Sequence, residues 1–94
     1  MDISEALAVA IRQIRLARNM TQEDFVGISG RTYISELERA VKNPSLAKID
    51  SIAVRMGVHP LTLLVACYEL KDGVTPAELL KTALTELTEL PNLV

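Results

Sequence analysis

Few residues in this chain of 94 are of types that could do catalytic or metal-binding chemistry. His59 is the single histidine and Cys67 the single cysteine, so a multi-histidine metal site and an intrachain disulfide are both excluded. His59 precedes Pro60 at an expected helix start, which favours a capping role. Cys67 is expected to be a small buried hydrophobe, with an intermolecular disulfide as the alternative. No serine or acid stands in a nucleophile context, and no phosphate-binding glycine loop is present. The sequence therefore predicts no enzyme, no catalytic residue, no metal and no cofactor.

The elements that carry the remaining polar residues have a helical pattern, and no strand-like alternation persists. Leu7, Ile11 and Ile14 recur at spacings of four and three, which places them on one stripe of a helix. Thr21 and Ser45 are candidate caps of two later helices. The expected helices cover residues 4–18, 21–27, 31–39, 45–57, 60–70 and 75–90.

The charge of the chain is divided unevenly along its length. The formal net charge is −2, but residues 1–60 carry eight basic and seven acidic residues, whereas residues 61–94 carry two basic and five acidic ones. A nearly neutral first part can bind a polyanion if its bases share one face, with modest non-specific affinity. No charged signal-peptide start precedes the first helix, and the longest uncharged run is too short to span a bilayer. We therefore expect a cytoplasmic protein with no membrane partner.

The glycine-containing segment between residues 27 and 30 joins two short expected helices, which is the pattern of a helix-turn-helix. In such a unit one helix enters the major groove of DNA and the other braces it across the phosphates. Helices alone are weak evidence, because many small domains are all-helical. Without further signals, Arg31, Thr32 and Glu36 would be ordinary solvated helix residues.

Three stretches add a specific resemblance: TQEDF at residues 21–25, YISELER at 33–39 and NPSL at 43–46. In this order they resemble the lambda-repressor/Cro-like (Xre) family of DNA-binding regulators. The stretch MGVHPL at residues 56–61 is similar to that family's link between its last two helices. The resemblance covers about residues 4–70. It implies an all-α fold, in which a five-helix lambda-repressor-like domain that binds double-stranded DNA is followed by an additional C-terminal amphipathic helix.

The resemblance also implies roles for residues of the third expected helix. Arg31, Thr32 and Glu36 would face base edges, while Tyr33 and Arg39 would lie near the backbone or the groove edge. Arginine can pair with the two major-groove acceptors of guanine, and glutamate can accept from the amino group of cytosine. An acid in this helix would otherwise repel phosphate.

Further roles follow for residues outside that helix. By resemblance, Gln22 would contact a phosphate from the start of the second helix, and Lys42 and Asn43 would meet phosphates from the loop after the third. Arg15 and Glu38 match a pair that forms a partly buried salt bridge in the family.

The sequence departs from the family pattern at two places. The segment of residues 22–34 is shorter than usual, which leaves open how Arg31 and Thr32 are aimed. Ala40 stands where the family often has glycine, and a left-handed backbone there would strain alanine, which leaves the loop conformation open. Lys48 and Arg55 are expected to be surface residues rather than DNA contacts.

Residues 1–70 are thus expected to form the helix-turn-helix DNA-binding domain, and residues 71–94 a linker and a C-terminal helix. Leu79, Leu80, Leu84 and Leu87 give this helix an apolar side. That side either covers the domain's own core or pairs with a second subunit, and we favour dimerisation because large apolar patches are normally covered.

The sequence predicts a sequence-specific transcriptional regulator, a homodimeric repressor on a pseudo-palindromic operator. Two alternatives remain. One is an antitoxin that binds a toxin and regulates its own synthesis, and the other is a protein-interaction module on the same fold.

Overall fold

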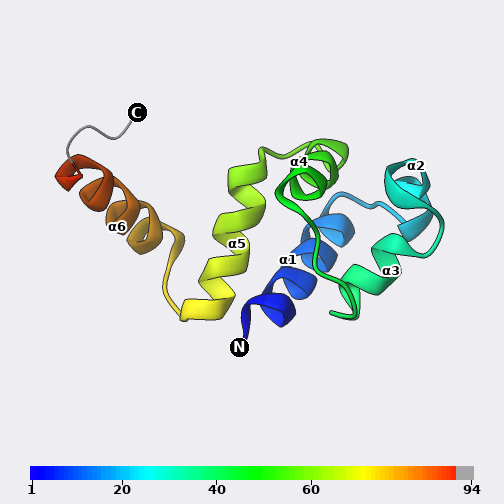
Figure 1. Ribbon diagram of the computed structural model, residues 1–94, viewed down its shortest axis with the longest axis horizontal. Helices are drawn as coiled ribbons and strands as arrows, with labels where there is room; N and C mark the ends of the chain where they lie inside the picture. The colour runs from blue at the N-terminus through cyan, green and yellow to red at the C-terminus, as the bar shows by residue number, and fades with distance from the viewer. Residues whose placement is uncertain (91–94) are drawn as a thin grey trace.

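The computed structural model describes residues 1–90 and is helical throughout that part of the chain (Figure 1). The expectation of an all-α fold is confirmed, and no strand occurs among these residues. The elements in chain order are α1 (Ile3–Ala17), the 3₁₀-helix η1 (Gln22–Phe25), α2 (Val26–Ser29), α3 (Tyr33–Glu38), α4 (Leu46–Arg55), α5 (Pro60–Asp72) and α6 (Pro76–Glu89).

Most helix starts are fixed by side chains that accept from otherwise unpaired backbone N–H groups. Ser45 caps α4 by accepting from the N–H of Lys48 at 3.2 Å, and Thr75 caps α6 in a capping box with Glu78. His59 caps α5, its Nδ1 accepting from the N–H of Leu61 at 2.9 Å. The cap of α1 is Asp2, two residues before the start that the hydrophobic pattern predicted. Asp2 accepts from the N–H of Glu5, and this hydrogen bond lowers the pKa of its carboxyl group.

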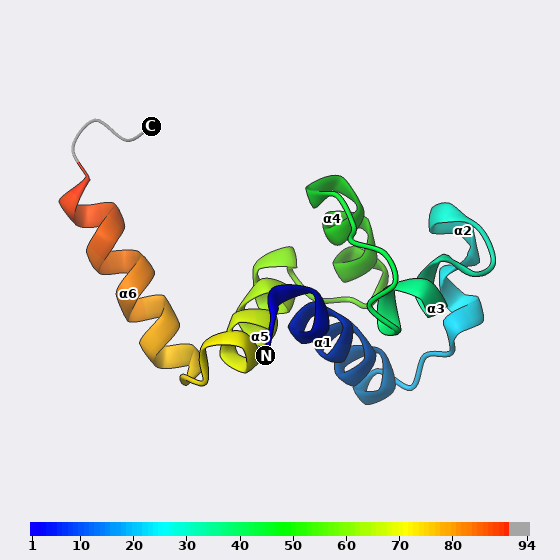
Figure 2. The ribbon, with the colours of Figure 1, turned by 60° about the horizontal axis from the view of Figure 1, so that its bottom comes forward.

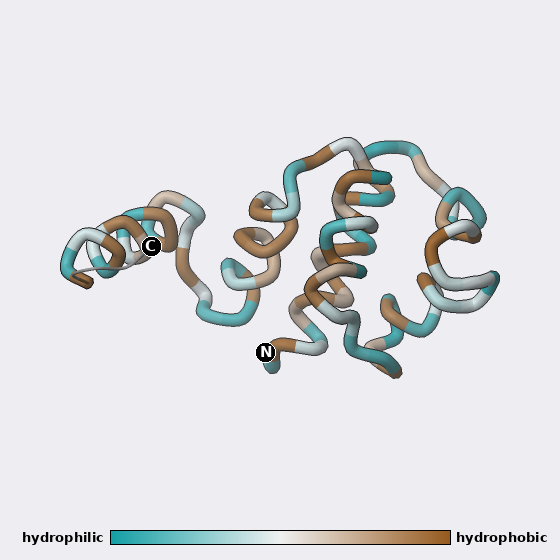
Figure 3. The backbone as a smooth tube through the Cα atoms, turned by 45° about the horizontal axis from the view of Figure 1, so that its top comes forward, coloured by the Kyte–Doolittle hydropathy of each residue, from teal (hydrophilic) through white to brown (hydrophobic). Residues whose placement is uncertain are grey.

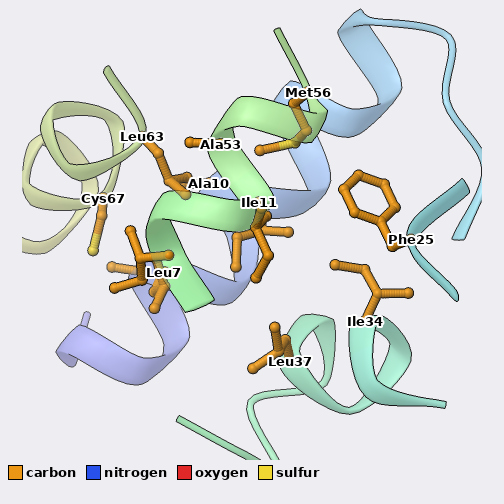
Figure 4. Packing of buried hydrophobic residues seen from close by; sticks show 13 residues of the cluster. Leu7, Ala10, Ile11, Phe25, Ile34, Leu37, Ala53, Met56, Leu63 and Cys67 are labelled. Atoms are coloured by element: carbon orange, nitrogen blue, oxygen red, sulfur yellow. The ribbon is translucent and has the colours of Figure 1, made fainter. Parts of the chain in front are cut away.

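The core lies between the first five helices, and α1 packs along α5 at its centre (Figure 4). Ile11 from α1 and Leu63 from α5 are completely buried, and Phe25 and Ile34 reach the same core from η1 and α3. Cys67 is also buried there, as expected for a small hydrophobe, and burial raises the pKa of its thiol. The short helices η1, α2 and α3 are therefore attached to the core by one or two large apolar side chains.

Helix α6 stands apart from this core. Figures 1 and 2 show it next to α5 alone, at the opposite end of the molecule from α2 and α3. None of its described side chains is buried, although the helix is apolar along one side (Figure 3). The molecule is accordingly elongated, measuring 44 × 27 × 23 Å.

The loop after α3 has a left-handed backbone conformation at Ala40, which alanine disfavours. Ala40 has φ of 57°, and the N–H of Val41 donates to the carbonyl of Glu36 at 2.9 Å, which closes a Schellman-type helix end. Gly57 occupies the equivalent position after α4 with φ of 75°. The ends of α3 and α4 therefore have the same type of geometry, although only the end of α4 has glycine at the left-handed position.

Replacing Ala40 with glycine is expected to raise the free energy of unfolding by about 1 kcal/mol, because glycine adopts this conformation without the Cβ clash. Urea unfolding followed by circular dichroism measures the change. Gly57→Ala is the reciprocal control: a Cβ there meets no atom within 4 Å, so the backbone strain alone should lower stability by a similar amount. An A40G protein less stable than the parent would contradict this account of the loop.

Candidate nucleic-acid interface

The segment of residues 22–38 folds as a short helix-turn-helix at one end of the molecule (Figures 1 and 2). Helix η1 continues directly into α2, and residues 30–32 turn the chain into α3. Gly30 has φ of 96°, a conformation that favours glycine, and it ends α2. The turn brings Ile34 opposite Phe25 in the core (Figure 4), and Tyr33, Ser35 and Glu36 of α3 are half-buried outside it.

The structure corrects the predicted position of two base-contacting candidates. Arg31 and Thr32 do not belong to α3, which begins at Tyr33. Residues 30–32 are used in the turn because Phe25 and Ile34 must both reach the core across a short connection. Arg31 is an exposed turn residue, and the exposed Thr32 is the N-cap of α3. Both therefore lie at the start of the candidate reading helix rather than along it.

The carboxylate of Glu36 already has partners within the protein. Its Oε1 accepts from the hydroxyl of Thr32 at 3.2 Å, and its Oε2 lies 3.5 Å from Nζ of Lys42. These contacts join the turn, α3 and the following loop on one side of α3. The ammonium of Lys42 also offsets the negative charge that Glu36 would present to a phosphate backbone.

The other candidate DNA-contacting residues differ in their exposure and in their contacts. Arg39 is exposed at the C-terminal end of α3, whereas Tyr33 is half-buried at its first turn. Desolvation raises the pKa of the Tyr33 phenol, so this group stays neutral at physiological pH. Asn43 turns toward the start of α1, where its Oδ1 accepts from the hydroxyl of Ser4 at 2.6 Å.

Arg15 and Glu38 form a bidentate ion pair beneath the helix-turn-helix. Nε of Arg15 donates to one carboxylate oxygen of Glu38 at 2.6 Å and Nη2 donates to the other at 2.9 Å. The two side chains are only 9% and 4% exposed. The hydrogen bonds that Arg15 donates to Glu38 raise the pKa of its guanidinium group despite its desolvation.

Two further contacts extend this network to η1. Nη1 of Arg15 donates to the carbonyl of Met20 at 2.8 Å, and Nε2 of Gln22 donates to Glu38 at 3.3 Å. The side chain of Gln22 therefore points inward in the free protein. The network joins the start of η1 to α1 and to α3, the candidate reading helix.

Two cationic residues that were not expected to contact DNA also contact the helix-turn-helix. Nζ of Lys48 donates to the carbonyl of Ile28 at 2.8 Å, and Nη1 of Arg55 donates to the carbonyl of Asp24 at 2.6 Å. Both come from α4 and span 20 and 31 residues of sequence. Arg55 is exposed, as expected of a surface residue, whereas Lys48 is half-buried, and the expectation that neither residue contacts DNA stays a prediction. Their seven-residue spacing places them on one face of the helix and could have indicated a shared contact, but the sequence does not show which element they face.

A helix-turn-helix family model, HTH_3, matches residues 11–63, which is more than half of the chain. The chain therefore belongs to this helix-turn-helix family, whose Xre-type members are DNA-binding transcription regulators and not enzymes. This confirms the family resemblance drawn from the sequence motifs.

The chain is similar to two curated relatives that are named control proteins. It is 47% identical over 57 residues to control protein C.BamHI of Bacillus amyloliquefaciens, a match that covers 57% of this chain and 70% of the relative. It is 42% identical over 55 residues to control protein C.SmaI of Serratia marcescens, covering 56% of this chain and 66% of that relative, just under two thirds.

Two solved structures share the fold over most of the chain. The clp gene regulator ClgR of Corynebacterium glutamicum superposes with a TM-score of 0.68 at 24% identity, covering 95% of this chain and 89% of that one. The hypothetical transcription factor NHTF from Neisseria gives a TM-score of 0.63 at 30% identity, covering 86% and 85%. Because both matches extend beyond residue 70, they include an additional C-terminal segment.

Within residues 1–90, no single helix is long and apolar enough to cross a membrane. Helices α4 and α5 meet those criteria only when taken together, and they are bent by 107° where they join.

Proposed function

We propose that this regulator binds a pseudo-palindromic operator as a homodimer and acts as a sequence-specific repressor. The observation that carries the proposal is the division of the chain into two ends. A helix-turn-helix with polar exposed residues forms one end, and an uncovered leucine-rich helix forms the other. In the proposal, residues 1–70 bind DNA and residues 71–94 join the subunits, although residues 91–94 lie outside the described part.

The proposed base contacts come from the turn and the outer side of α3. Arg31 is exposed and carries a bidentate donor that matches guanine. Thr32 and Glu36 are joined by a hydrogen bond, so they would approach the groove as one polar unit. A cytosine amino group could replace the Thr32 hydroxyl as the donor to Glu36. Tyr33 and Arg39 flank these groups at the two ends of α3.

The proposed phosphate contacts lie on either side of α3. Lys42 has a side chain that is half exposed, so its ammonium can leave Glu36 for a phosphate at little cost. Asn43 keeps its amide nitrogen available while its oxygen accepts from Ser4. Gln22 stands at the first position of η1, where a backbone N–H group points outward from a helix start.

Arg31→Ala is expected to relax base preference at one position of each half-site by about 1–3 kcal/mol, because it removes a bidentate contact to a base edge. Lys42→Gln should instead weaken binding to all sequences alike and reduce the salt slope by about one phosphate. Titrations of both variants against a selected site and its single-base variants, at several salt concentrations, separate these outcomes. Equal losses on every sequence for both variants would contradict the assignment of Arg31.

The proposed dimer interface is the outer side of α6 together with its junction with α5. Leu84 is 68% exposed, and Leu80 and Leu87 on the same helix and Leu90 directly after it are each at least half exposed. Leu79, Leu80 and Ala83 face Leu61 and Leu64 of α5 across an apolar groove of about 400 Å³. Completely burying one leucine side chain contributes about 1.5–3 kcal/mol, so covering several of them in both copies would favour association.

In the proposal, the dimer represses transcription by occluding a promoter. The names of the two curated relatives, both control proteins, are consistent with a regulator of expression. The proposal places the protein in the cytoplasm with its DNA. The exposed leucines of α6 also fit the alternative, an antitoxin that covers this face with a toxin. Co-purification of a second small protein with a single copy of this chain would favour that alternative over a homodimer.

A further inference from the structure

Helix α4 holds the helix-turn-helix through two cationic side chains on one side. Lys48 and Arg55 are seven residues apart, a spacing that places them on the same helix face two turns apart. Each donates to a backbone carbonyl of the η1–α2 segment, at 2.8 Å for Lys48 and 2.6 Å for Arg55. Neither contact involves a carboxylate, so both cations are committed to the backbone of the unit that α4 supports.

Lys48 connects the two sides of the turn. The carbonyl of Ile28 is one of the last carbonyls of α2, which have no partner within the helix. A cation is favourable there because it meets the negative end of the helix dipole. The same Nζ lies 5.8 Å from the centre of the Tyr33 ring, at the first residue of α3. One ammonium group therefore contacts the end of α2 and the start of α3, and residues 30–32 lie between these contacts.

Arg55 fixes the first half of the unit. Its Nη1 donates to the carbonyl of Asp24 in η1, and its Nη2 would lie 3.7 Å from a Cβ at Gly27 in α2. The guanidinium thus lies against the junction of η1 and α2. Arg55 therefore holds the junction of η1 and α2, and Lys48 holds the other half of the helix-turn-helix, which is the turn and the start of α3.

The helix-turn-helix needs such external support because its helices are short. α2 has four residues and α3 has six, and isolated helices of this length are unstable in water. Their orientation must therefore come from contacts with the rest of the domain. Phe25, which directly precedes α2, and Ile34 in α3 are buried in the core, but residues 30–32 between the two helices are all exposed.

We infer that Lys48 is a positioning residue for base reading, which sets the aim of Arg31, Thr32 and Tyr33 without itself contacting DNA. Lys48 holds the end of α2 and the first residue of α3 at a fixed separation, so the turn between them presents Arg31 and Thr32 in one arrangement. Arg55 supports the same unit from the η1 side. This inference rests on the proposed reading role of Arg31 and Thr32.

The test compares Lys48→Met with Lys48→Arg. Methionine keeps the aliphatic stem and removes the donor, whereas arginine keeps a cation that can donate to Ile28 and stack on Tyr33. Arg12→Met is the control for the loss of one positive charge, because Arg12 is an exposed cation on α1 outside the proposed DNA contacts and the proposed dimer interface. Circular dichroism establishes that each variant is folded at the temperature used.

Each protein selects sites from a random duplex pool, and its affinity for the best site and for single-base variants is measured over a range of salt. For K48M we expect the preference at the positions read by Arg31 and Thr32 to fall roughly 5–10-fold, in the range of one lost base contact, with an unchanged salt slope. K48R and R12M should keep the parent's preference.

Three results would overturn the inference. In the first, K48M keeps the parent's base preference. In the second, it weakens all sites alike with a salt slope smaller by about one phosphate, which would make Lys48 a phosphate contact. In the third, K48R loses preference as K48M does. If the parent protein itself selects no motif, the proposed function fails, and this outcome is distinct from a parent motif that K48M retains.

Discussion

Replacing Glu38 with glutamine is expected to lower the free energy of unfolding by about 3 kcal/mol or more, because the change leaves the charge of Arg15 buried without its counter-ion. Glutamine has the same shape, so packing is preserved. The Glu38 side chain is only 4% exposed and that of Arg15 9%, so water cannot solvate the guanidinium that has lost its counter-ion. Glutamine also offers one acceptor oxygen instead of two, so at least one donor from Arg15 or Gln22 would meet its NH2 group. In a domain of this size the melting temperature should fall by more than 10 °C at about 4–8 °C per kcal/mol.

Urea unfolding of E38Q gives the loss directly, and Glu69→Gln is the matched control on an exposed carboxylate of α5. The control should change stability by less than about 0.5 kcal/mol. The double variant Arg15→Met with Glu38→Leu removes both charges and should recover much of the loss, since well-packed apolar residues can replace a buried pair. A loss below 1 kcal/mol in E38Q would mean that the pair does not hold the helix-turn-helix to α1.

Replacing Leu84 with glutamate is expected to convert the proposed dimer to monomers and to weaken operator binding by roughly 10²–10⁴-fold. A dimer contacts both half-sites at once, and linking two binding modules in this way raises affinity by about this factor. A monomer contacts one half-site and loses that gain in affinity. Leu84 is 68% exposed within one chain, so the charge should leave the fold of the monomer unchanged. Sedimentation equilibrium measures the mass, and titration of a two-half-site duplex measures the affinity.

Thr85→Glu provides the matched control, because it adds the same charge to the adjacent, exposed polar side of α6. The control should remain dimeric and bind as the parent does. A parent protein that is monomeric at concentrations where it binds DNA, or an L84E protein that stays dimeric, would contradict the assignment of α6.

The parts of the fold that local patterns determine could be predicted from the sequence. The stripe of Leu7 and Ile11 is buried in α1 as its spacing indicated, and Ser45 and Thr75 cap helices because a short polar side chain before an apolar run satisfies free N–H groups. The family motifs identified the helix-turn-helix itself, which the family match confirms.

The parts that depend on tertiary contacts could not be predicted in this way. The start of α3 lies two residues later than its helical pattern indicated, because the short connection uses Arg31 and Thr32 in the turn. The contacts of Lys48 and Arg55 join residues 20 and 31 positions apart, and no local pattern specifies them. Ala40 adopts a conformation that its side chain disfavours because the Schellman-type end of α3 requires it.

The selection of binding sites from a random duplex pool by the purified protein, at near-physiological salt, tests the central claim most directly. A dimer with two reading units predicts a two-fold symmetric motif whose half-site centres are about 34 Å apart, one turn of DNA. A pool without enrichment, or an enriched motif with a single unrepeated half-site, would contradict a homodimer that reads a pseudo-palindromic operator.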